Sequence, residues 1–358
     1  MKGLRSRSAL RQAHAICAPA GRWTATRGHS GIRHATSQSM GHQSTVLGRT
    51  QQSSKLPRGG KQDGPGQVST EHQAANAAPK RPDEIEPGVN KTFSRFDLSG
   101  TVHLVTGGGQ GLGLAMAEGL AEAGGRVYCL DRCSEPSQHF TVAQERLLPY
   151  DGGRLFYKGV DITDTADLDK AITTIADEWG RLDGVIAAAG IQQITPAVDY
   201  TIEDAEKMLR VNFLGVLMTA TSAARQMIKY KNHGAICLVA SMSGMIANKG
   251  LISPVYNASK ASVIQLARSL SMEWSKIQPD GRGGIRVNCL SPGHVVTPMV
   301  RKNFEEVEGL RQTWEAENMM GRISEPEEFK GAGLFLLSQA SSFMTGNNLV
   351  IDGGHTAW

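Results

Sequence analysis

The chain has 358 residues, a formal net charge of +4, 40% hydrophobic residues and 20% charged residues. This composition fits a globular enzyme of one large domain or two small ones. The charge is uneven: residues 1–62 carry eleven Lys or Arg and no Asp or Glu, whereas the rest carries 27 basic and 34 acidic residues, a net charge near −7. The basic total therefore gives no reason to expect nucleic-acid binding by the folded part. No run approaches the roughly 20 apolar residues needed to span a bilayer, so we expect no membrane partner.

Residues 1–92 are rich in Gly, Ser, Gln, Pro and Arg and show no periodic apolar pattern. We interpret them as a disordered N-terminal extension that precedes a folded domain over residues 93–358. Its first part is rich in Arg and Ser and free of acids, which is the composition of a mitochondrial transit peptide. Arg5, Arg7 and Arg11 alternate with apolar residues, which allows a short basic amphipathic helix. The alternative is a disordered basic tail on a cytoplasmic protein.

Five cysteines are scattered along the chain, at positions 17, 129, 133, 237 and 289. They form no Cys-x-x-Cys pair, and the sequence has no His-x-x-x-His or His-Glu cluster. This pattern argues against a disulfide framework and against a structural zinc, and we expect no metal.

From about residue 93 onward, short apolar runs alternate with helical patterns, which is typical of βαβ units and a parallel sheet. We predict seven strands, over Val102–Thr106, Arg126–Asp131, Arg154–Lys158, Gly184–Ala189, Ala235–Ala240, Ile285–Leu290 and Asn348–Ile351. We predict helices over Leu112–Ala123, Thr165–Trp179, Ile202–Tyr230 (two helices broken near Val211), Val255–Lys276 and Glu325–Ser338. The sequence therefore predicts an α/β fold: a single Rossmann-type, doubly wound domain with helices flanking a seven-stranded parallel sheet.

A glycine-rich segment follows the first predicted strand and precedes the first predicted helix. Tight turning from strand to helix requires positive φ angles, and close approach of a diphosphate leaves no room for a Cβ atom. The helix start offers free N–H groups and the positive end of the helix dipole to the phosphates. The segment therefore predicts a dinucleotide site formed by Gly107, Gly109, Gln110, Gly111, Leu112 and Gly113.

The second predicted strand ends at Asp131, about twenty residues beyond the glycine-rich segment. A carboxylate there can accept both hydroxyl groups of the adenosine ribose and would repel a 2′-phosphate. Asp131 thus favours NAD(H). Because Arg132 is adjacent and could bind a 2′-phosphate, NADP(H) is the alternative cofactor. A solvated turn Asp without a cofactor role is the simpler alternative.

Tyr256 and Lys260 lie four positions apart in a predicted helix, so their side chains share one face. A phenol with a pKa near about 10 is a poor base at neutral pH, and a fixed ammonium one turn away favours the phenolate and lowers that pKa. Ser241 follows the predicted strand over residues 235–240. The plain alternative is a helix that carries a Tyr and a Lys for no chemical reason.

Taken in order, the Gly-x-x-x-Gly-x-Gly spacing, Ser241, Tyr256 and Lys260 resemble the cofactor loop and active site of the short-chain dehydrogenase/reductase family. The resemblance covers roughly residues 96–358 and implies reversible carbonyl–alcohol oxidoreduction by direct hydride transfer. It implies that Ser241 binds the substrate oxygen, that Tyr256 transfers the proton, and that Lys260 lowers the pKa of Tyr256 and binds the nicotinamide ribose. Asn212 matches the residue that ties a water to the Lys; a capping or kink role is the alternative.

The same resemblance implies further cofactor contacts. Asp161 and Ile162, after the third predicted strand, resemble the pair that contacts adenine. Residues 187–190 resemble the family's Asn-Ala-Ala-Gly motif and place Ala189 and Gly190 by the cofactor. Ala187 replaces the Asn of that motif, which removes a side-chain hydrogen bond to the central sheet. The nicotinamide is expected against the segment after the sixth strand, formed by Pro292, Gly293, Val295 or Val296, and Thr297.

Several segments resemble the fungal polyol (arabinitol-type) and sorbose reductase branch of the family: residues 241–244, 266–270, 325–329 and 352–358. This resemblance implies a small-molecule polyol or ketose as substrate. One alternative is a 3-oxoacyl-thioester reductase. Another is a binding protein on an inactive dehydrogenase fold, which would require a broken catalytic set.

The family resemblance also implies a homotetramer, in which matching helices and the last strand region pack against copies in other subunits. Two segments here have apolar surface for such contacts: the terminal segment ending in Trp358, and the predicted helix with Ala258, Ala261, Ile264, Leu266 and Leu270. The alternative is that these residues complete the core of a monomer.

Overall fold

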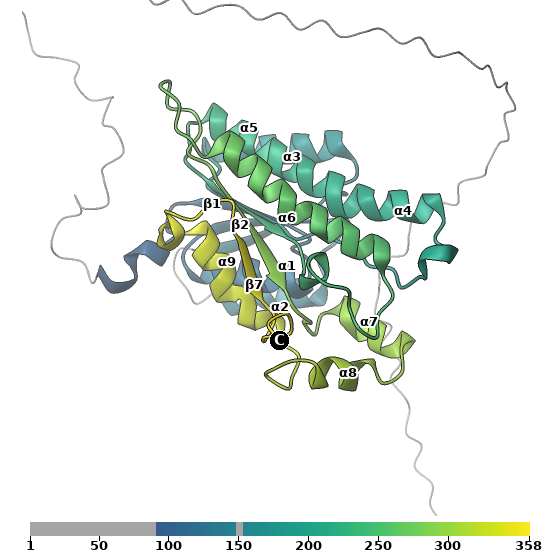
Figure 1. Cartoon of the computed structure of the whole chain (residues 1–358). Helices are drawn as coiled ribbons and strands as arrows, with labels where there is room; N and C mark the ends of the chain where they lie inside the picture. Colours follow the sequence, from purple (N-terminus) through teal and green to yellow (C-terminus); the bar gives the residue numbers. More distant parts are fainter. Residues whose placement is uncertain (1–90, 148–152) are drawn as a thin grey trace, which may run out of the picture. The chain divides into compact units, whose positions relative to one another are not determined.

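The computed structural model describes residues 91–147 and 153–358. Seven parallel strands form one sheet in the order β3-β2-β1-β4-β5-β6-β7 (Figure 1). The strands are β1 Val102–Thr106, β2 Arg126–Asp131, β3 Arg154–Gly159, β4 Gly184–Ala187, β5 Ala235–Val239, β6 Arg286–Pro292 and β7 Asn348–Ile351. Every residue of β1, β4 and β5 is buried, as expected for apolar strands with helices on both faces. The strand order reverses between β1 and β4, which is where open parallel sheets bind ligands.

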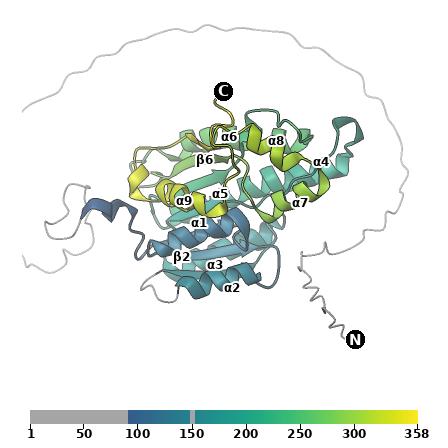
Figure 2. The same cartoon turned by 90° about the horizontal axis from the view of Figure 1, so that it is seen from below.

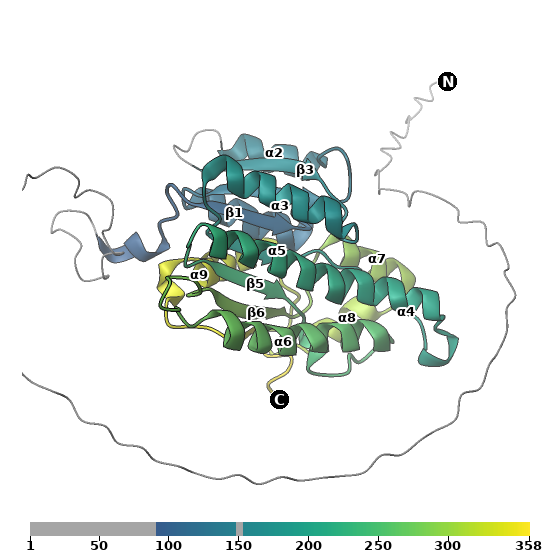
Figure 3. The same ribbon diagram turned by 90° about the horizontal axis from the view of Figure 1, so that it is seen from above.

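Helices form a layer on each face of the sheet. One face packs against α1 (Gly111–Glu122), α2 (Gln138–Leu147) and α9 (Lys330–Leu337), as seen from below in Figure 2. The other packs against α3 (Thr165–Trp179), α5 (Val216–Lys229) and α6 (Pro254–Trp274), which cross the front of Figure 3. The shorter helices are α4 (Ile202–Leu209), α7 (Pro298–Glu306) and α8 (Leu310–Ala316). Short 3-10 helices are η1 (Lys91–Phe96), η2 (Ala197–Asp199), η4 (Met242–Gly244), η5 (Pro326–Phe329) and η6 (Gln339–Ser341).

The predicted fold class is confirmed, with seven parallel strands between two helical layers. β1, β2 and β7 have the predicted bounds; β4 ends two residues early, at Ala187, and β6 continues two residues further, to Pro292. The helix α2 was not predicted. Its buried side chains, Phe140, Ala143 and Leu147, are the apolar i, i+3, i+7 signal that would have found it.

The two helices predicted over residues 202–230 are present as α4 and α5, and the predicted break near Val211 falls in the segment between them. This segment, Arg210–Gly215, is a π-helix, so the chain stays helical through the break. A π-helical turn holds one residue more than an α-helical turn, and such turns occur where a side chain is directed to a functional site. A Cβ atom on Gly215 would collide with the side chain of Ile162, so this segment packs tightly on the core.

The predicted N-terminal extension, residues 1–92, lies outside the described residues except for the backbone of its last two. Its boundary and its targeting role therefore stay predictions. Within the described ranges, none of the helices combines the length and apolar character that a membrane crossing requires.

Candidate active site

The carboxyl ends of the strands bring the predicted site residues to one edge of the sheet. Gly107 follows β1, Asp131 ends β2, Gly190 lies three residues beyond β4, Ser241 lies two residues beyond β5, and Pro292 ends β6. Because all of these strands are parallel, these positions share an edge, and they flank the reversal in strand order between β1 and β4.

The turn from β1 into α1 can be made only with glycine. Gly107 and Gly111 have φ angles of 68° and 58°, in the left-handed region. A Cβ on Gly107 would lie 2.7 Å from the Cα of Ala189, and a Cβ on Gly113 would overlap the carbonyl oxygen of Gly107. No side chain caps the start of α1 at Gln110, which leaves its first N–H groups for an anion. These features fit the diphosphate of a dinucleotide.

Asp131 faces this turn. Its Oδ2 accepts a hydrogen bond from Gly109 N at 3.0 Å, and its Oδ1 accepts one from Arg132 N at 2.9 Å. A Cβ on Gly109 would lie 2.8 Å from Asp131 Oδ2, so the carboxylate and the turn are in contact. The half-exposed carboxylate is thus held beside the turn over residues 107–113, called the phosphate turn below, where an adenosine ribose would lie.

The predicted adenine pair has mainly local contacts in the chain itself. Asp161 Oδ1 accepts hydrogen bonds from both N and Oγ1 of Thr163 at 2.8 Å, which closes a turn before α3. Ile162 is buried in the core beneath the π-helical segment. Their contact with adenine stays a prediction.

Ser241, Tyr256 and Lys260 come together where β5 ends against α6. Ser241 begins the η4 turn, and its Oγ accepts a hydrogen bond from Ser243 N at 3.1 Å. A Cβ on Gly244 would lie 2.7 Å from the carbonyl carbon of Lys260, so this glycine lets the turn rest directly on α6. Tyr256 and Lys260 lie one turn apart on α6, with Lys260 Nζ 5.8 Å from the centre of the Tyr256 ring.

The pKa of Tyr256 differs from the prediction. Burial of its hydroxyl raises the pKa of Tyr256, and a hydrogen bond with Ser241 opposes this only in part. Burial also lowers the pKa of Lys260 to about 8. The Lys260 ammonium donates a hydrogen bond to Val239 O at 2.9 Å. The expected lowering of the pKa of Tyr256 by Lys260 is therefore not seen, because removal of the Tyr256 hydroxyl from water outweighs the effect of its hydrogen-bond partner.

Asn212 is buried in the π-helical segment and holds the chain just after β4. Its Oδ1 accepts a hydrogen bond from Ile191 N, and its Nδ2 donates one to Ile191 O, both at 2.9 Å. Nδ2 also donates to Ser259 Oγ at 3.1 Å. A Cβ on Gly190 would lie 3.4 Å from both Asn212 Oδ1 and Lys260 Nζ, so the two side chains border the same small space. A proton relay through Asn212 stays a prediction.

The segment after β6 closes over the start of α1. A Cβ on Gly293 would lie 2.7 Å from the Cα of Asp352, and the buried Val295 pairs with Ser324 in a single bridge. Thr297 Oγ1 accepts a hydrogen bond from Val300 N at 3.3 Å and caps α7. The side chains of Thr297 and Pro298 border Gly111, which places this segment beside the phosphate turn.

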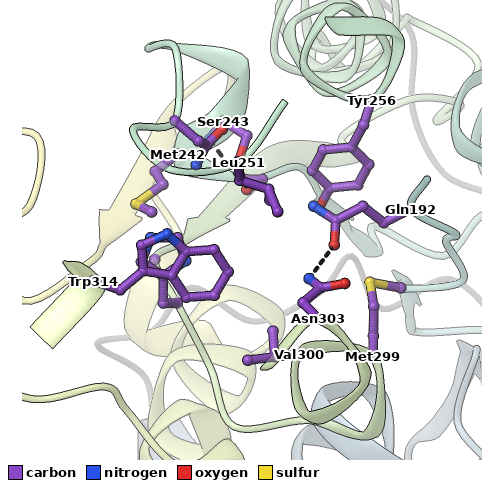
Figure 4. Close-up of a pocket in the computed structure, with 13 residues that line it drawn as sticks. Gln192, Met242, Ser243, Leu251, Tyr256, Met299, Val300, Asn303 and Trp314 are labelled. Atoms are coloured by element: carbon purple, nitrogen blue, oxygen red, sulfur yellow. Dashed lines mark hydrogen bonds between the residues drawn. The ribbon is translucent and has the colours of Figure 1, made fainter. Parts of the chain in front are cut away.

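A cavity next to Tyr256 contains residues that no sequence motif indicated (Figure 4). None of the described residues that line it carries a charged side chain at neutral pH. In addition to Ser241 and Tyr256, its lining consists of Gln192, Met242, Ser243, Asn248, Leu251, Gly293, His294, Met299, Val300, Asn303 and Trp314. Burial lowers the pKa of His294 to about 3, so its ring is neutral. The cavity is therefore suited to an uncharged ligand.

The described part of the chain has no group of three or more His, Cys, Asp or Glu side chains placed to hold a metal ion. Cys129, Cys237 and Cys289 are free and buried, as expected of small core residues.

Comparisons with known proteins agree with this geometry. A family model described as Enoyl-(Acyl carrier protein) reductase matches residues 107–356. The chain is 35% identical to a D-arabinitol 2-dehydrogenase [ribulose-forming] of Candida albicans (strain WO-1), over 74% of this chain and 95% of that protein. It is 36% identical to an NADH-dependent L-xylulose reductase of Ambrosiozyma monospora (74% and 97%) and 38% identical to a galactitol 2-dehydrogenase of Rhizobium johnstonii (74% and 98%).

Solved structures agree as well. A short-chain type dehydrogenase/reductase from Mycobacterium marinum is 33% identical, with a TM-score of 0.65 over 74% of this chain and 99% of that one. A gluconate 5-dehydrogenase from Burkholderia cenocepacia, in complex with NADP and tartrate, is 30% identical, with a TM-score of 0.65 over 74% and 99%. The chain belongs to the short-chain dehydrogenase/reductase family. It is an NAD(P)-dependent oxidoreductase that acts on alcohols and ketones.

Proposed function

We propose that this enzyme interconverts a sugar alcohol and a ketose. The observation that carries the proposal is the position of Ser241 and Tyr256 in the wall of a cavity lined only by uncharged side chains, several of them polar. A polyol presents several hydroxyl groups and no charge, which matches such a lining. The names of the polyol dehydrogenases among its relatives support the same substrate class.

In this proposal a nicotinamide cofactor, held by the turn from β1 into α1 and by Lys260, would supply the chemistry of hydride transfer when bound. Ser241 Oγ hydrogen-bonds the substrate oxygen, and Tyr256 exchanges the proton of that oxygen. At neutral pH the raised pKa of Tyr256 keeps its hydroxyl protonated, and Lys260, with a pKa of about 8, is mostly an ammonium. This protonation state is ready to reduce a ketone, because Tyr256 can donate a proton to the oxygen as the hydride arrives. Alcohol oxidation requires Tyr256 to lose its proton first.

A substrate panel tests the proposal. We expect kcat/KM for the best polyol or ketose to exceed that for an acetoacetyl thioester by at least about tenfold. The cavity is small, and its polar side chains can hydrogen-bond the hydroxyl groups of a sugar alcohol or ketose. Initial rates with polyols, ketoses and acetoacetyl thioesters, each with both cofactors, provide the comparison. A preference for the thioester would instead support the 3-oxoacyl-thioester reductase alternative.

For the cofactor we propose a preference for NAD(H) over NADP(H), supported by the Asp131 carboxylate fixed at the phosphate turn. Removing this carboxylate in Asp131→Ala is expected to narrow the ratio of kcat/KM for NADH over NADPH by about tenfold, because repulsion of the 2′-phosphate is lost. Arg132→Ala is the matched control on the neighbouring residue and should widen the ratio or leave it unchanged. A wild-type enzyme that prefers NADPH would contradict the proposal.

We propose a mitochondrial location, supported by the acid-free, Arg-rich composition of residues 1–62. A fluorescent fusion that carries residues 1–62 should collect in mitochondria. A diffuse cytosolic signal would support the cytoplasmic alternative.

We also propose a homotetramer. The exposed large apolar side chains include Ile202, Leu209, Leu214 and Met272 on the helices, and Met319, Met320, Phe343 and Trp358 near the C-terminus. Among the described strands, none pairs with the outer edge of β7, the last strand of the sheet. On α6, Ile264 and Leu270 belong to the monomer core, whereas Ala258 and Ala261 are exposed. Light scattering should give about four times the 38.4 kDa chain mass; a single chain mass would refute the tetramer.

A further inference from the structure

Two amide side chains lie side by side in the wall of the cavity beside Tyr256. Asn303 Nδ2 donates a hydrogen bond to Gln192 Oε1 at 2.7 Å, and Figure 4 shows this bond. The other amide atoms, Gln192 Nε2 and Asn303 Oδ1, have no hydrogen-bond partner among the described residues. The pair therefore presents one donor and one acceptor at the cavity wall, which is the combination that one hydroxyl group satisfies.

Both amides are held in place by the fold. Gln192 follows Ile191, whose N–H and C=O are both hydrogen-bonded by Asn212. Asn303 is the only fully buried residue of α7, and it lies beside the partly buried Val300 and Phe304, which pack against an apolar cluster that includes Trp314. Because these apolar side chains already hold α7 in place, a buried amide next to Tyr256 is costly for packing alone: an apolar residue at the same position would avoid the loss of solvation.

The same cavity contains further polar atoms without partners. Asn248 Nδ2 and His294 Nε2 are buried and have no hydrogen-bond partner in the described part of the chain. Each such atom costs about 1–3 kcal/mol if nothing pairs with it. A ligand with several hydroxyl groups, or water in its place, would satisfy these atoms.

We propose that Gln192 and Asn303 together bind a substrate hydroxyl group other than the reacting one, and that they thereby select polyhydroxylated substrates over plain alcohols and ketones. This inference rests on the proposed function. Gln192 Nε2 donates to the oxygen of that hydroxyl group, and the hydroxyl proton is donated to Asn303 Oδ1. Asn248 and His294 are the partners for hydroxyl groups further along the substrate.

The test compares two substrates in each variant: the best ketose from the panel, and a plain ketone such as 2-pentanone. In Gln192→Leu and in Asn303→Leu, kcat/KM for the ketose should fall about 10–100-fold, because a hydrogen-bonded hydroxyl loses its partner. The value for the plain ketone should change less than about threefold. Met299→Leu, in the apolar part of the same wall, is the matched control and should leave the ratio of the two values unchanged.

NADH binding, measured by fluorescence, should stay within about threefold of wild type in both variants, since neither residue borders the phosphate turn. Equal losses for ketose and plain ketone, or no loss for either, would overturn the inference. Because Gln192 is half-exposed, Gln192→Leu decides the question even if Asn303→Leu does not fold. A wild-type enzyme without any preference for the ketose would overturn the proposed function as well, whereas a wild-type preference that survives both substitutions would overturn this inference alone.

Discussion

Replacing Tyr256 with Phe is expected to lower kcat by about 10²–10⁴-fold, which is the contribution typical of a positioned proton donor. Tyr256 carries the only phenol among the described residues of the cavity wall. Its hydroxyl hydrogen-bonds Ser241, and burial raises its pKa, so no neighbour can replace it as the proton donor. Steady-state rates in both directions measure the loss. NADH affinity should stay unchanged, because the ring remains on α6.

Tyr230→Phe is the matched control for this substitution. The hydroxyl of Tyr230 donates to Asp177 Oδ1 at 2.6 Å, at the other end of the helical layer, so kcat should not change. A Tyr256→Phe enzyme that retains activity within tenfold of wild type would rule out Tyr256 as the proton donor.

Replacing Lys260 with Met is expected to lower kcat by about 10²-fold and at the same time to stabilise the fold. We expect the activity loss because the family resemblance implies that the Lys260 ammonium binds the nicotinamide ribose, a contact that Met cannot make. The gain in stability follows because burial lowers the pKa of Lys260 from 10.5 to about 8. At 1.36 kcal/mol per pKa unit, burying the ammonium costs about 3 kcal/mol of folding free energy at neutral pH. The substitution also leaves Val239 O without its hydrogen bond, which costs about 1 kcal/mol. The free energy of unfolding should therefore rise by about 2 kcal/mol.

The pH dependence gives this prediction a second readout. Between pH 8 and 10.5 the unfolded chain keeps a proton on Lys260 that the folded chain has lost, so wild-type stability should increase with pH across this window. Urea unfolding at pH 7, 8 and 9.5 should show this increase in wild type and not in Lys260→Met. Lys276→Met, at an exposed position just beyond α6, should retain it. A Lys260→Met protein less stable than wild type at pH 7 would show that the buried ammonium contributes to stability.

The sheet was predictable from the sequence because buried parallel strands are short, continuous apolar runs bounded by turn residues. The runs over 102–106, 126–131 and 348–351 match β1, β2 and β7 at both ends. The parallel order also placed Gly107, Asp131 and Ser241 at one edge, because each follows or ends a strand.

The substrate side of the site was not predictable for two physical reasons. Its amide pair joins residues 111 positions apart, and the inward-facing apolar residues of α7, Val300 and Phe304, are too few to distinguish a short helix over the site from a loop. The direction of the pKa shift of Tyr256 was also predicted wrongly. The sequence showed a neighbouring cation but did not show that the Tyr256 hydroxyl and the Lys260 ammonium are both removed from water, and this desolvation is the larger effect.

The π-helical segment Arg210–Gly215 sets the rotational phase between α4 and α5. Each α-helical residue turns the chain by about 100°, so one surplus residue rotates everything before it by that angle relative to everything after it. Deleting a single residue here would let α4 and α5 merge into one regular helix. The same deletion would turn α4 by about 100° relative to α5 and carry the side chain of Asn212 away from Ile191. The position of Gln192 therefore depends on the count of residues in a helix that does not itself line the cavity.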